Sequence, residues 1–270
     1  MTTPNSPETL EAVEALLPLF ADAPVAVLTG AGISTDSGIP DYRGKGSPPR
    51  TPMRIDQYME DPQYRRRFWA GARVGSVRMG GVQPNAGHLA LAHLEAAGRI
   101  DGVITQNVDG LHRRAGSRTV VELHGSGAAF RCTACGHRTS RAEVLGAFDD
   151  LNPGFAEAHS DAEIAPDGDA IVDAGAEVIV PPCPVCGGIL RPDVVYFGET
   201  VPTGVFAAAE SLLGGAGALL LAGTSLAVNT GVRLVHRAER RGIPIAIINR
   251  GATSVDARAT VRIDGGTTEV

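Results

Sequence analysis

Cysteine, lysine and long apolar runs are scarce in this chain of 270 residues. Four cysteines are present, and Lys45 is the only lysine, so arginine carries almost all of the positive charge. No apolar run approaches the roughly 18 residues that a transmembrane helix needs. The longest candidate, 216–222, is bounded by glycines and is typical of a buried strand. The sequence therefore predicts no membrane partner.

The charge balance is acidic, with a net charge of −6. Its one basic run, Arg65 to Arg67, is explained by a solvated helix face. Because phosphate binding needs concentrated cations, we expect no nucleic-acid partner. We interpret the near absence of lysine as genomic base composition, which favours a bacterial source. No charged-then-apolar leader is apparent, so the expected location is the cytoplasm.

The four cysteines form two close pairs, Cys132 with Cys135 and Cys183 with Cys186, and a glycine follows each pair. A Cys-x-x-Cys pair presents two sulfurs to one tetrahedral ion. Two disulfides or unrelated core thiols are the alternatives, but disulfides mainly stabilise small secreted domains. We predict one structural Zn²⁺ bound by four thiolates. Such an ion has no open coordination position, so the chemistry must lie elsewhere.

Short apolar runs alternate with helical patterns along most of the chain. The predicted strands lie at 25–28, 102–105, 120–123, 194–197, 218–222 and 244–248. The predicted helices lie at 8–20, 86–97 and 229–241. Strand–helix–strand alternation indicates a parallel sheet with helices on both faces. The predicted fold class is α/β, a Rossmann-like doubly wound parallel sheet with a small zinc-binding module and a helical and loop module.

A glycine turn follows the first predicted strand, with the sequence TGAGIS at 29–34. A Gly-x-Gly turn lets backbone amides approach a pyrophosphate without a Cβ clash. The turn departs from the dehydrogenase fingerprint, because Thr35 stands where the third glycine belongs. No second strand ending in an acidic residue follows either. The sequence therefore disfavours an ordinary dehydrogenase.

Two stretches interrupt the alternation. Residues 44–84 contain no convincing strand and predict a loop with short helices. Residues 127–190 contain all four cysteines, whose pairs must meet in space. We expect a discontinuous NAD-binding domain (1–43, 85–126 and 191–270), a cofactor loop and helical module (44–84), and a zinc-binding module (127–190), with a cleft between.

Three motifs together resemble the signatures of sirtuins, the NAD-dependent protein-lysine deacylases. They are GAGISTDSGIPDYRG at 30–44, TQNVDGLH at 105–112 and ELHG at 122–125. The cysteine pairs, FGE at 197–199, GTS at 223–225 and NR at 249–250 follow in the family's order. The resemblance covers about residues 15–270. It is nearest to the class II branch, which includes the mitochondrial lipoamidase-type sirtuin, on the basis of 151–153, 165–169 and the spacing between the cysteine pairs.

The resemblance implies that NAD is a co-substrate and that an acyl-lysine protein or peptide is the substrate. It implies His124 as the base for a ribose hydroxyl, Asn107 at the ribose and an ordered water, and Asp109 at the nicotinamide carboxamide. An imidazole titrates near neutral pH and suits a base. The alternatives are a histidine that merely ends a strand and polar residues that close a strand-to-helix turn.

The same resemblance assigns the remaining contacts. The expected cofactor-binding residues are Gly30, Ala31, Gly32, Ile33, Ser34, Asp41, Tyr42, Arg43, Gln106, Asn107, Val108, Asp109, Gly223, Thr224, Ser225, Asn249, Arg250, Gly251 and Thr267. The expected substrate residues are Val194, Val195, Phe197, Gly198 and Glu199, where an extended peptide can add as a strand. An ordinary core strand is the alternative for that segment.

Other readings remain beside deacylation. The same NAD site could transfer ADP-ribose to a protein, or the chain could sense NAD without turnover as a zinc-ribbon binding protein. By resemblance, the desuccinylating branch of the family carries a Tyr-x-x-Arg pair just after the first signature. Residues 45–50 lack that tyrosine, and Tyr64 and Arg67 fall about twenty residues late, so we expect no preference for succinyl. A longer neutral acyl chain and a lipoyl group stay open as alternatives. The other six histidines are expected at the surface or in packing, and no feature of the sequence indicates an oligomeric state.

Overall fold

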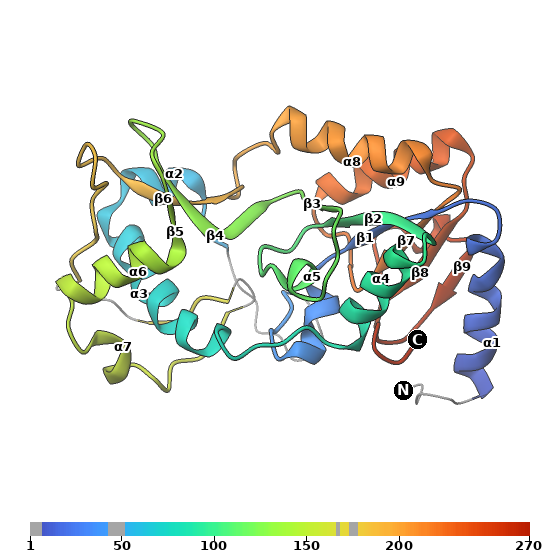
Figure 1. Cartoon of the computed structure of the whole chain (residues 1–270), viewed down its shortest axis with the longest axis horizontal. Coiled ribbons are helices and arrows are strands. Elements are labelled where there is room, and N and C mark those ends of the chain that lie inside the picture. The colour runs from blue at the N-terminus through green and yellow to red at the C-terminus, as the bar shows by residue number, and fades with distance from the viewer. Residues whose placement is uncertain (1–6, 43–51, 166–167, 173–177) are drawn as a thin grey trace.

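The computed structural model describes residues 7–42, 52–165, 168–172 and 178–270. Arg43, expected at a phosphate, and residues 166–167 of the class II segment lie outside these ranges. Figure 1 shows two lobes. The large lobe is built on a six-stranded sheet and the small lobe on a three-stranded sheet.

The large sheet is parallel throughout, with strand order β3-β2-β1-β7-β8-β9. Its strands are β1 (Val25–Thr29), β2 (Ile100–Thr105), β3 (Val120–Glu122), β7 (Ala218–Ala222), β8 (Ile245–Ile248) and β9 (Val261–Ile263). The helices of this lobe are α1 (Pro7–Leu16), η1 (Leu17–Phe20), η2 (Ala31–Ser37), α4 (Ala86–Ala96), α5 (Leu111–Arg114), α8 (Thr203–Gly215), α9 (Asn229–Arg241) and η3 (Asp256–Arg258). The predicted fold class is confirmed.

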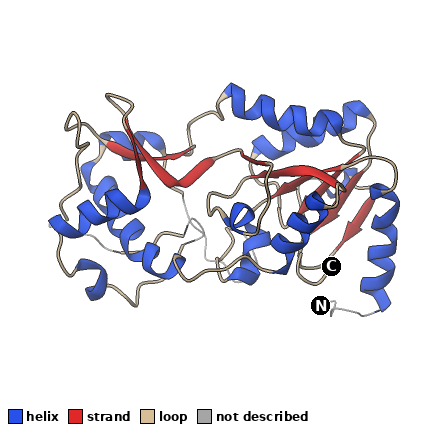
Figure 2. Ribbon diagram, viewed as in Figure 1, coloured by secondary structure: helices blue, strands red, loops and turns tan. Residues whose placement is uncertain are grey.

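Helices cover both faces of the large sheet (Figure 2). Every residue of β1 is buried, as expected for a central parallel strand. Because side chains alternate between the two faces, Ala26 and Leu28 join the cluster under α8 and α9. Val25 and Val27 join the opposite cluster, with residues of α1 and α4. This two-sided core leaves the carboxyl edge of the sheet as the open edge for a ligand.

The small lobe has an antiparallel sheet of order β5-β4-β6. Its elements are α2 (Ile55–Glu60), α3 (Pro62–Met79), β4 (Gly125–Cys132), β5 (Arg138–Ser140), α6 (Arg141–Leu151), α7 (Phe155–Ala158) and β6 (Leu190–Val194). Trp69 of α3 packs between Phe130 of β4 and Phe148 of α6, with ring centroids at 5.1 and 6.4 Å. Described residues from 52–84 and from 127–190 thus share one hydrophobic cluster.

Two predicted elements are wrong. The run at 194–197 is not a strand of the parallel sheet, because β6 ends at Val194 and pairs with β4 in the small sheet. Helix α3 has 18 residues and is not short. Its polar, arginine-rich sequence gives a weak helical signal, and burial of Trp69, Ala70 and Val74 stabilises it. None of the helices in the described part of the chain has the length and apolar character that crossing a bilayer requires.

Candidate functional site

The candidate site lies at the carboxyl edge of the large sheet. The chain passes from β1 to β2 and β3 on one side, and later to β7 and β8 on the other. The strand order therefore reverses between β1 and β7. Open α/β sheets bind ligands in the crevice at such a switch point.

The glycine turn and the end of β7 touch through their backbones. A Cβ on Gly30 would come within 2.8 Å of Thr224 Oγ1, and one on Gly32 within 2.8 Å of the Gly223 carbonyl oxygen. Gly223 also has a φ of +61°, which favours glycine. The close approach leaves room for glycine alone and brings 30–33 beside 223–224. Both segments are expected at the cofactor.

Ser34 joins the glycine turn to the segment after β2. Its hydroxyl donates to Asp109 Oδ2 at 2.8 Å, and Asn107 Nδ2 donates to Ser34 Oγ at 3.1 Å. Asn107 Nδ2 also lies 3.1 Å from the Gly30 carbonyl oxygen. Asp109 Oδ1 accepts from Leu111 N at 2.9 Å, so this carboxylate closes the turn into α5 as well. The structure thus brings two of the three expected catalytic residues to the turn.

His124 lies next to the same segment. Its Nδ1 donates to the Gln106 carbonyl oxygen at 2.9 Å, because a carbonyl can only accept. The other ring nitrogen, Nε2, is therefore the one that can accept a proton. Burial lowers the pKa of His124, although the hydrogen bond to Gln106 raises it. A neutral imidazole of this kind is suited to general-base chemistry.

Gln106 also connects the two sides of the crevice. Its Nε2 donates to Thr224 Oγ1 at 2.9 Å, and its backbone N–H donates to the Thr29 carbonyl oxygen at 3.0 Å. Thr224 is 5% exposed. Residues from β1, β2, β3 and β7 are thus connected through one hydrogen-bonded network at the sheet edge.

A buried histidine pair lies beneath this network. His88 and His112 are 0% and 2% exposed, with ring centroids 4.8 Å apart. His112 Nε2 lies 2.8 Å from Thr29 Oγ1, and that hydroxyl donates to Thr105 Oγ1 at 2.9 Å. Desolvation, and then the nearby His88, lower the pKa of His112 to about 3. Both histidines are therefore buried packing residues.

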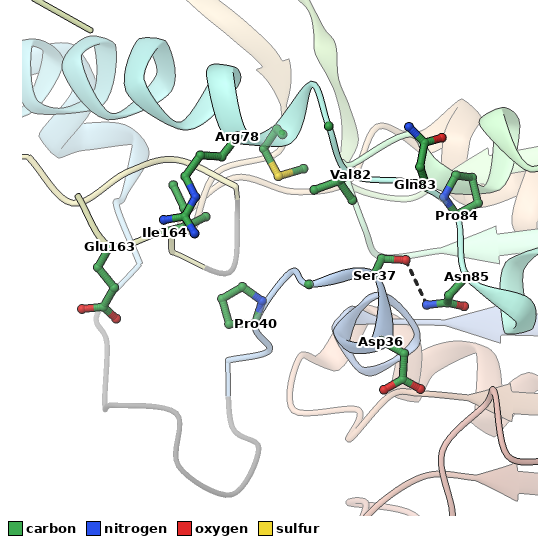
Figure 3. Close-up of a pocket in the computed structure, with 13 residues that line it drawn as sticks. Asp36, Ser37, Pro40, Arg78, Val82, Gln83, Pro84, Asn85, Glu163 and Ile164 are labelled. Carbon is green, nitrogen blue, oxygen red and sulfur yellow. Dashed lines mark hydrogen bonds between the residues drawn. The ribbon is translucent and has the colours of Figure 1, made fainter. Parts of the chain in front are cut away.

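Asn85 is a residue to which sequence reasoning assigned nothing. Its Nδ2 donates to Ser37 Oγ at 3.0 Å (Figure 3). The same Nδ2 donates to the Ile33 carbonyl oxygen at 2.7 Å, and Oδ1 accepts from Gly87 N at 3.0 Å. It therefore caps α4 and holds η2 at once. An asparagine after proline at the start of a helical pattern is a signal that could have found the cap.

A cavity of 660 Å³ adjoins this cap (Figure 3). Asp36, Ser37 and Pro40 border it on one side, and Arg78 and Ile164 on the other. The cavity lies between residues 36–40, which follow the glycine turn, and the small lobe. Residues of both lobes line it.

Two further expected cofactor residues, Asn249 and Arg250, follow the next strand of the sheet, β8. Asn249 follows β8, and its Nδ2 donates to the carbonyl oxygens of Arg250 and Gly251 at 3.1 and 3.0 Å. Arg250 pairs with Asp36 of η2 at 3.1 Å and with Glu269 at 2.7 Å. In this structure its guanidinium therefore contacts carboxylates. Further expected residues in the described part are Ala31, Asp41, Tyr42, Val108, Ser225 and Thr267.

The four cysteines converge on one point in the small lobe. Their sulfurs all lie within 4.8 Å of one another. The Cys132–Cys186 and Cys135–Cys183 sulfurs are 3.5 and 3.8 Å apart. A tetrahedron with Zn–S bonds of about 2.3 Å has sulfurs about 3.8 Å apart, so the cluster fits Zn²⁺.

The two cysteine pairs have the same backbone form. Gly136 N donates to the Cys132 carbonyl oxygen at 3.1 Å, and Gly187 N to that of Cys183 at 2.8 Å. Both glycines have a φ of +72°. The Cys135 backbone N–H lowers the pKa of the Cys132 thiol, which favours the thiolate that binds a metal. The donor set fits a closed, structural ion.

The expected substrate segment begins where β6 ends. Val195 N donates to the His124 carbonyl oxygen at 2.8 Å, so the segment runs beside His124. Ile55 N donates to the Phe197 carbonyl oxygen at 3.0 Å, and the Phe197 side chain is 46% exposed. The Glu199 carboxylate, expected at the substrate, accepts hydrogen bonds from Arg191 and from Tyr196 N.

Comparison with known proteins gives the family. The Sir2 family model matches residues 30–230. The "NAD-dependent protein deacetylase 1" of Mycobacterium avium is 53% identical over 258 residues, covering 94% of this chain and 92% of that protein. Solved structures of Sir2 with a p53 peptide and NAD⁺, and of Sir2 bound to an acetylated peptide, are 33% and 31% identical, with TM-scores of 0.76 and 0.74. Each of these two structural comparisons covers 95% of this chain and 94% of the other chain. The chain belongs to the Sir2, or sirtuin, family.

Proposed function

We propose that this protein is an NAD-dependent protein-lysine deacetylase. It converts acyl-lysine, NAD and water to lysine, nicotinamide and O-acyl-ADP-ribose. The observation that carries the proposal is the junction at Ser34, which joins Asn107 and Asp109 to the glycine turn beside His124. The names and ligands of the relatives agree with it.

Each residue of the site has a separate role in the proposed reaction. NAD, when bound, supplies the ribose carbon from which nicotinamide leaves and at which the acyl oxygen attacks. The Gly30 and Gly32 turn allows backbone amides to approach the pyrophosphate. Asn107 and Asp109 orient the ribose and the carboxamide. His124 Nε2 accepts the proton of a ribose hydroxyl, since its Nδ1 is held by Gln106. The four thiolates hold a structural Zn²⁺ away from this chemistry.

The test is a product analysis with acetyl-lysine peptide and NAD. We expect nicotinamide, free lysine peptide and O-acetyl-ADP-ribose in equal amounts by mass spectrometry. Peptide that keeps its acetyl group and gains ADP-ribose would instead assign transferase activity. NAD binding with no nicotinamide release would assign an NAD sensor. Either result would overturn the proposal.

The class II assignment belongs to the same proposal. Asn152, in the segment 151–153, donates from Nδ2 to the Ile179 carbonyl oxygen and accepts at Oδ1 from Ile179 N, both at 2.8 Å. These bonds close that segment onto 178–180, which supports a structural role for its asparagine. A panel of acetyl, octanoyl, lipoyl and succinyl peptides tests the branch. We expect a neutral acyl group to be preferred, and preference for succinyl contradicts this.

The domain division and the location are also proposals. The discontinuous sheet domain is supported by the strands that form one parallel sheet, while Trp69 packs the described helices of 52–84 against the zinc-binding module. Limited proteolysis that releases the small lobe as one fragment tests this division. A cytoplasmic location is supported by the four cysteines, which form one metal-type cluster and no disulfide, as is usual in a reducing compartment. Cell fractionation tests it.

A further inference from the structure

Arg191 is a charged residue in an apolar place. It lies on β6 and is 3% exposed, and it is the one arginine among the buried residues of the described chain. Removing a guanidinium from water costs several kcal/mol unless its donors are satisfied. Arg191 therefore needs a specific set of partners, and the identity of those partners shows what it holds in place.

Within the described chain, the hydrogen bonds of the Arg191 side chain all go to residues that follow it. Its Nη1 and Nη2 donate to the two carboxylate oxygens of Glu199 at 2.6 and 2.5 Å. Nη2 also donates to the Val194 carbonyl oxygen at 2.6 Å, and the guanidinium lies 4.9 Å from the centroid of the Tyr196 ring. The pair with Glu199 is bidentate, the geometry that lysine cannot reproduce.

Glu199 completes a closed loop. Its Oε2 accepts a second hydrogen bond, from Tyr196 N at 2.9 Å. Burial raises the pKa of Glu199, but the hydrogen bonds from Arg191 and Tyr196 N, together with the nearby arginine charges, outweigh burial and lower the pKa. The carboxylate therefore stays charged, and with Arg191 it fixes both ends of 194–199.

The loop 194–199 lies next to His124 and carries an exposed aromatic ring. Its Val195 N is bonded to the His124 carbonyl oxygen, and Gly198 has a φ of +93°, which turns the chain after Phe197. Phe197 is exposed although it is large and apolar. Arg191 and Glu199 thus set where the backbone of 194–198 and the Phe197 ring stand relative to His124.

We propose that Arg191 is a positioning residue for the acyl-lysine substrate: through its bidentate pair with Glu199 it holds residues 194–199 in the conformation that receives the peptide beside His124. The inference rests on the proposed function. Arg191 acts through the loop and does not touch the substrate. Its loss therefore weakens peptide binding and leaves the NAD side of the site intact.

The test compares R191M, R191K and E199Q with the wild type. Measured are the KM for NAD, the KM for acetyl-lysine peptide, and the peptide Kd by fluorescence anisotropy. KM does not depend on the fraction of enzyme that folds, and the Kd is calculated from the concentration of folded protein after gel filtration, so a poorly folding variant still reports. R237M is the matched control, because Arg237 pairs with Glu210 on the exposed side of α9 and α8.

For R191M we expect the peptide KM and Kd to rise about tenfold or more, and the KM for NAD to stay within about twofold, because a buried charged hydrogen bond is lost. R191K should recover about a third of the loss, since lysine keeps the charge but not the fork. The double variant R191M/E199Q should bind the peptide no more weakly than R191M alone, because both changes break the same ion pair. R237M should match the wild type.

The two proposals fail in different ways. A wild type that binds peptide without consuming it overturns the deacetylase, while a weaker peptide Kd in R191M still supports the role of Arg191. A wild type that deacetylates, with R191M unchanged in peptide KM and Kd, overturns the role of Arg191 alone. A wild type that binds no peptide overturns both.

Discussion

Ser34 and Asp109 lie 75 positions apart, yet the Ser34 hydroxyl donates to Asp109 Oδ2 at 2.8 Å. Ser34 is 1% exposed, so water does not compete for this bond. The contact joins the turn after β1 to the segment after β2. It therefore makes the two strand ends one rigid site, and it can be broken by removing one oxygen atom.

The S34A variant should bind NAD more weakly. A hydrogen bond to a charged group contributes about 1.5–3 kcal/mol, so we expect the KM for NAD to rise about 10- to 150-fold. The peptide KM should change little. S76A is the control, because the hydrogen bonds described for the Ser76 hydroxyl are local: it donates to the Arg73 carbonyl oxygen and accepts from Arg73 Nη1 of its own helix. Equal KM values for NAD in S34A and wild type would show that the junction has no functional role.

His124 should set the acid limb of the pH–rate profile. Its pKa is lowered from 6.5 by burial, and the base must be neutral to accept a proton. Activity is therefore retained above this lowered pKa and lost as the pH falls through it. We expect kcat/KM to have an acid midpoint below 6.5, and H124A to lose about 10²–10⁴-fold in activity while the fold is kept. A midpoint above 6.5 contradicts the assignment.

Buried His112 should make the protein sensitive to acid. Its folded pKa is about 3, below the 6.5 of an exposed histidine, so the unfolded state binds the proton first. The stabilisation is complete above pH 6.5 and is lost as the pH falls toward 3. Between pH 6.5 and 5 this amounts to about 2 kcal/mol of unfolding free energy. Urea titrations of wild type and H112Q measure it, and equal pH slopes for the two proteins speak against it.

Zinc removal should unfold the small lobe first. All four sulfurs contribute to one cluster, so C132S leaves an incomplete site. We expect zinc content to fall from one ion per chain to a fraction of it, with a lower melting temperature and reduced activity. T133A, in the same turn, keeps all four thiols and should bind zinc normally. A C132S variant that stays folded and fully active would refute the structural ion.

Gly223 should tolerate no side chain. Its φ is +61°, and a Cβ there would clash with the backbone of Gly32 and Ile33. We expect G223A to lose about 2–4 kcal/mol of stability, from left-handed strain and overpacking. G146A is the matched control, because that position in α6 is exposed and has no neighbour within 4 Å of the added atom. It should gain about 0.5–1 kcal/mol. Thermal unfolding of both variants decides the matter.

Much of the large lobe could be predicted from local patterns. Runs such as 25–28 and 218–222 are apolar on both faces, and the structure buries both strands completely. The zinc cluster could be predicted too, because Cys-x-x-Cys spacing already places each pair of sulfurs. Strand β9 and helix α8 were not predicted, since three residues at the sheet edge and an alanine-rich helix carry weak signals.

Partners distant in the chain could not be predicted. The run at 194–197 looks like its neighbours, but its pairing with β4 depends on the small lobe. Nothing local distinguishes Arg191 from the other arginines, and Glu199 was expected at the substrate. Its contact with Arg191 depends on the fold of β6 and of the chain that follows it.

The sequence by itself determined which residues could carry the chemistry: glycines where backbones touch, thiols in pairs, and polar groups after apolar runs. These features are local, and local chemistry restricts them. The tertiary structure alone decided three hydrogen bonds: from Ser34 to Asp109, from Asn85 to the Ile33 carbonyl oxygen in the glycine turn, and from Arg191 to Glu199. Such contacts depend on the packing of both lobes, a sum over many weak interactions that no short stretch of sequence contains.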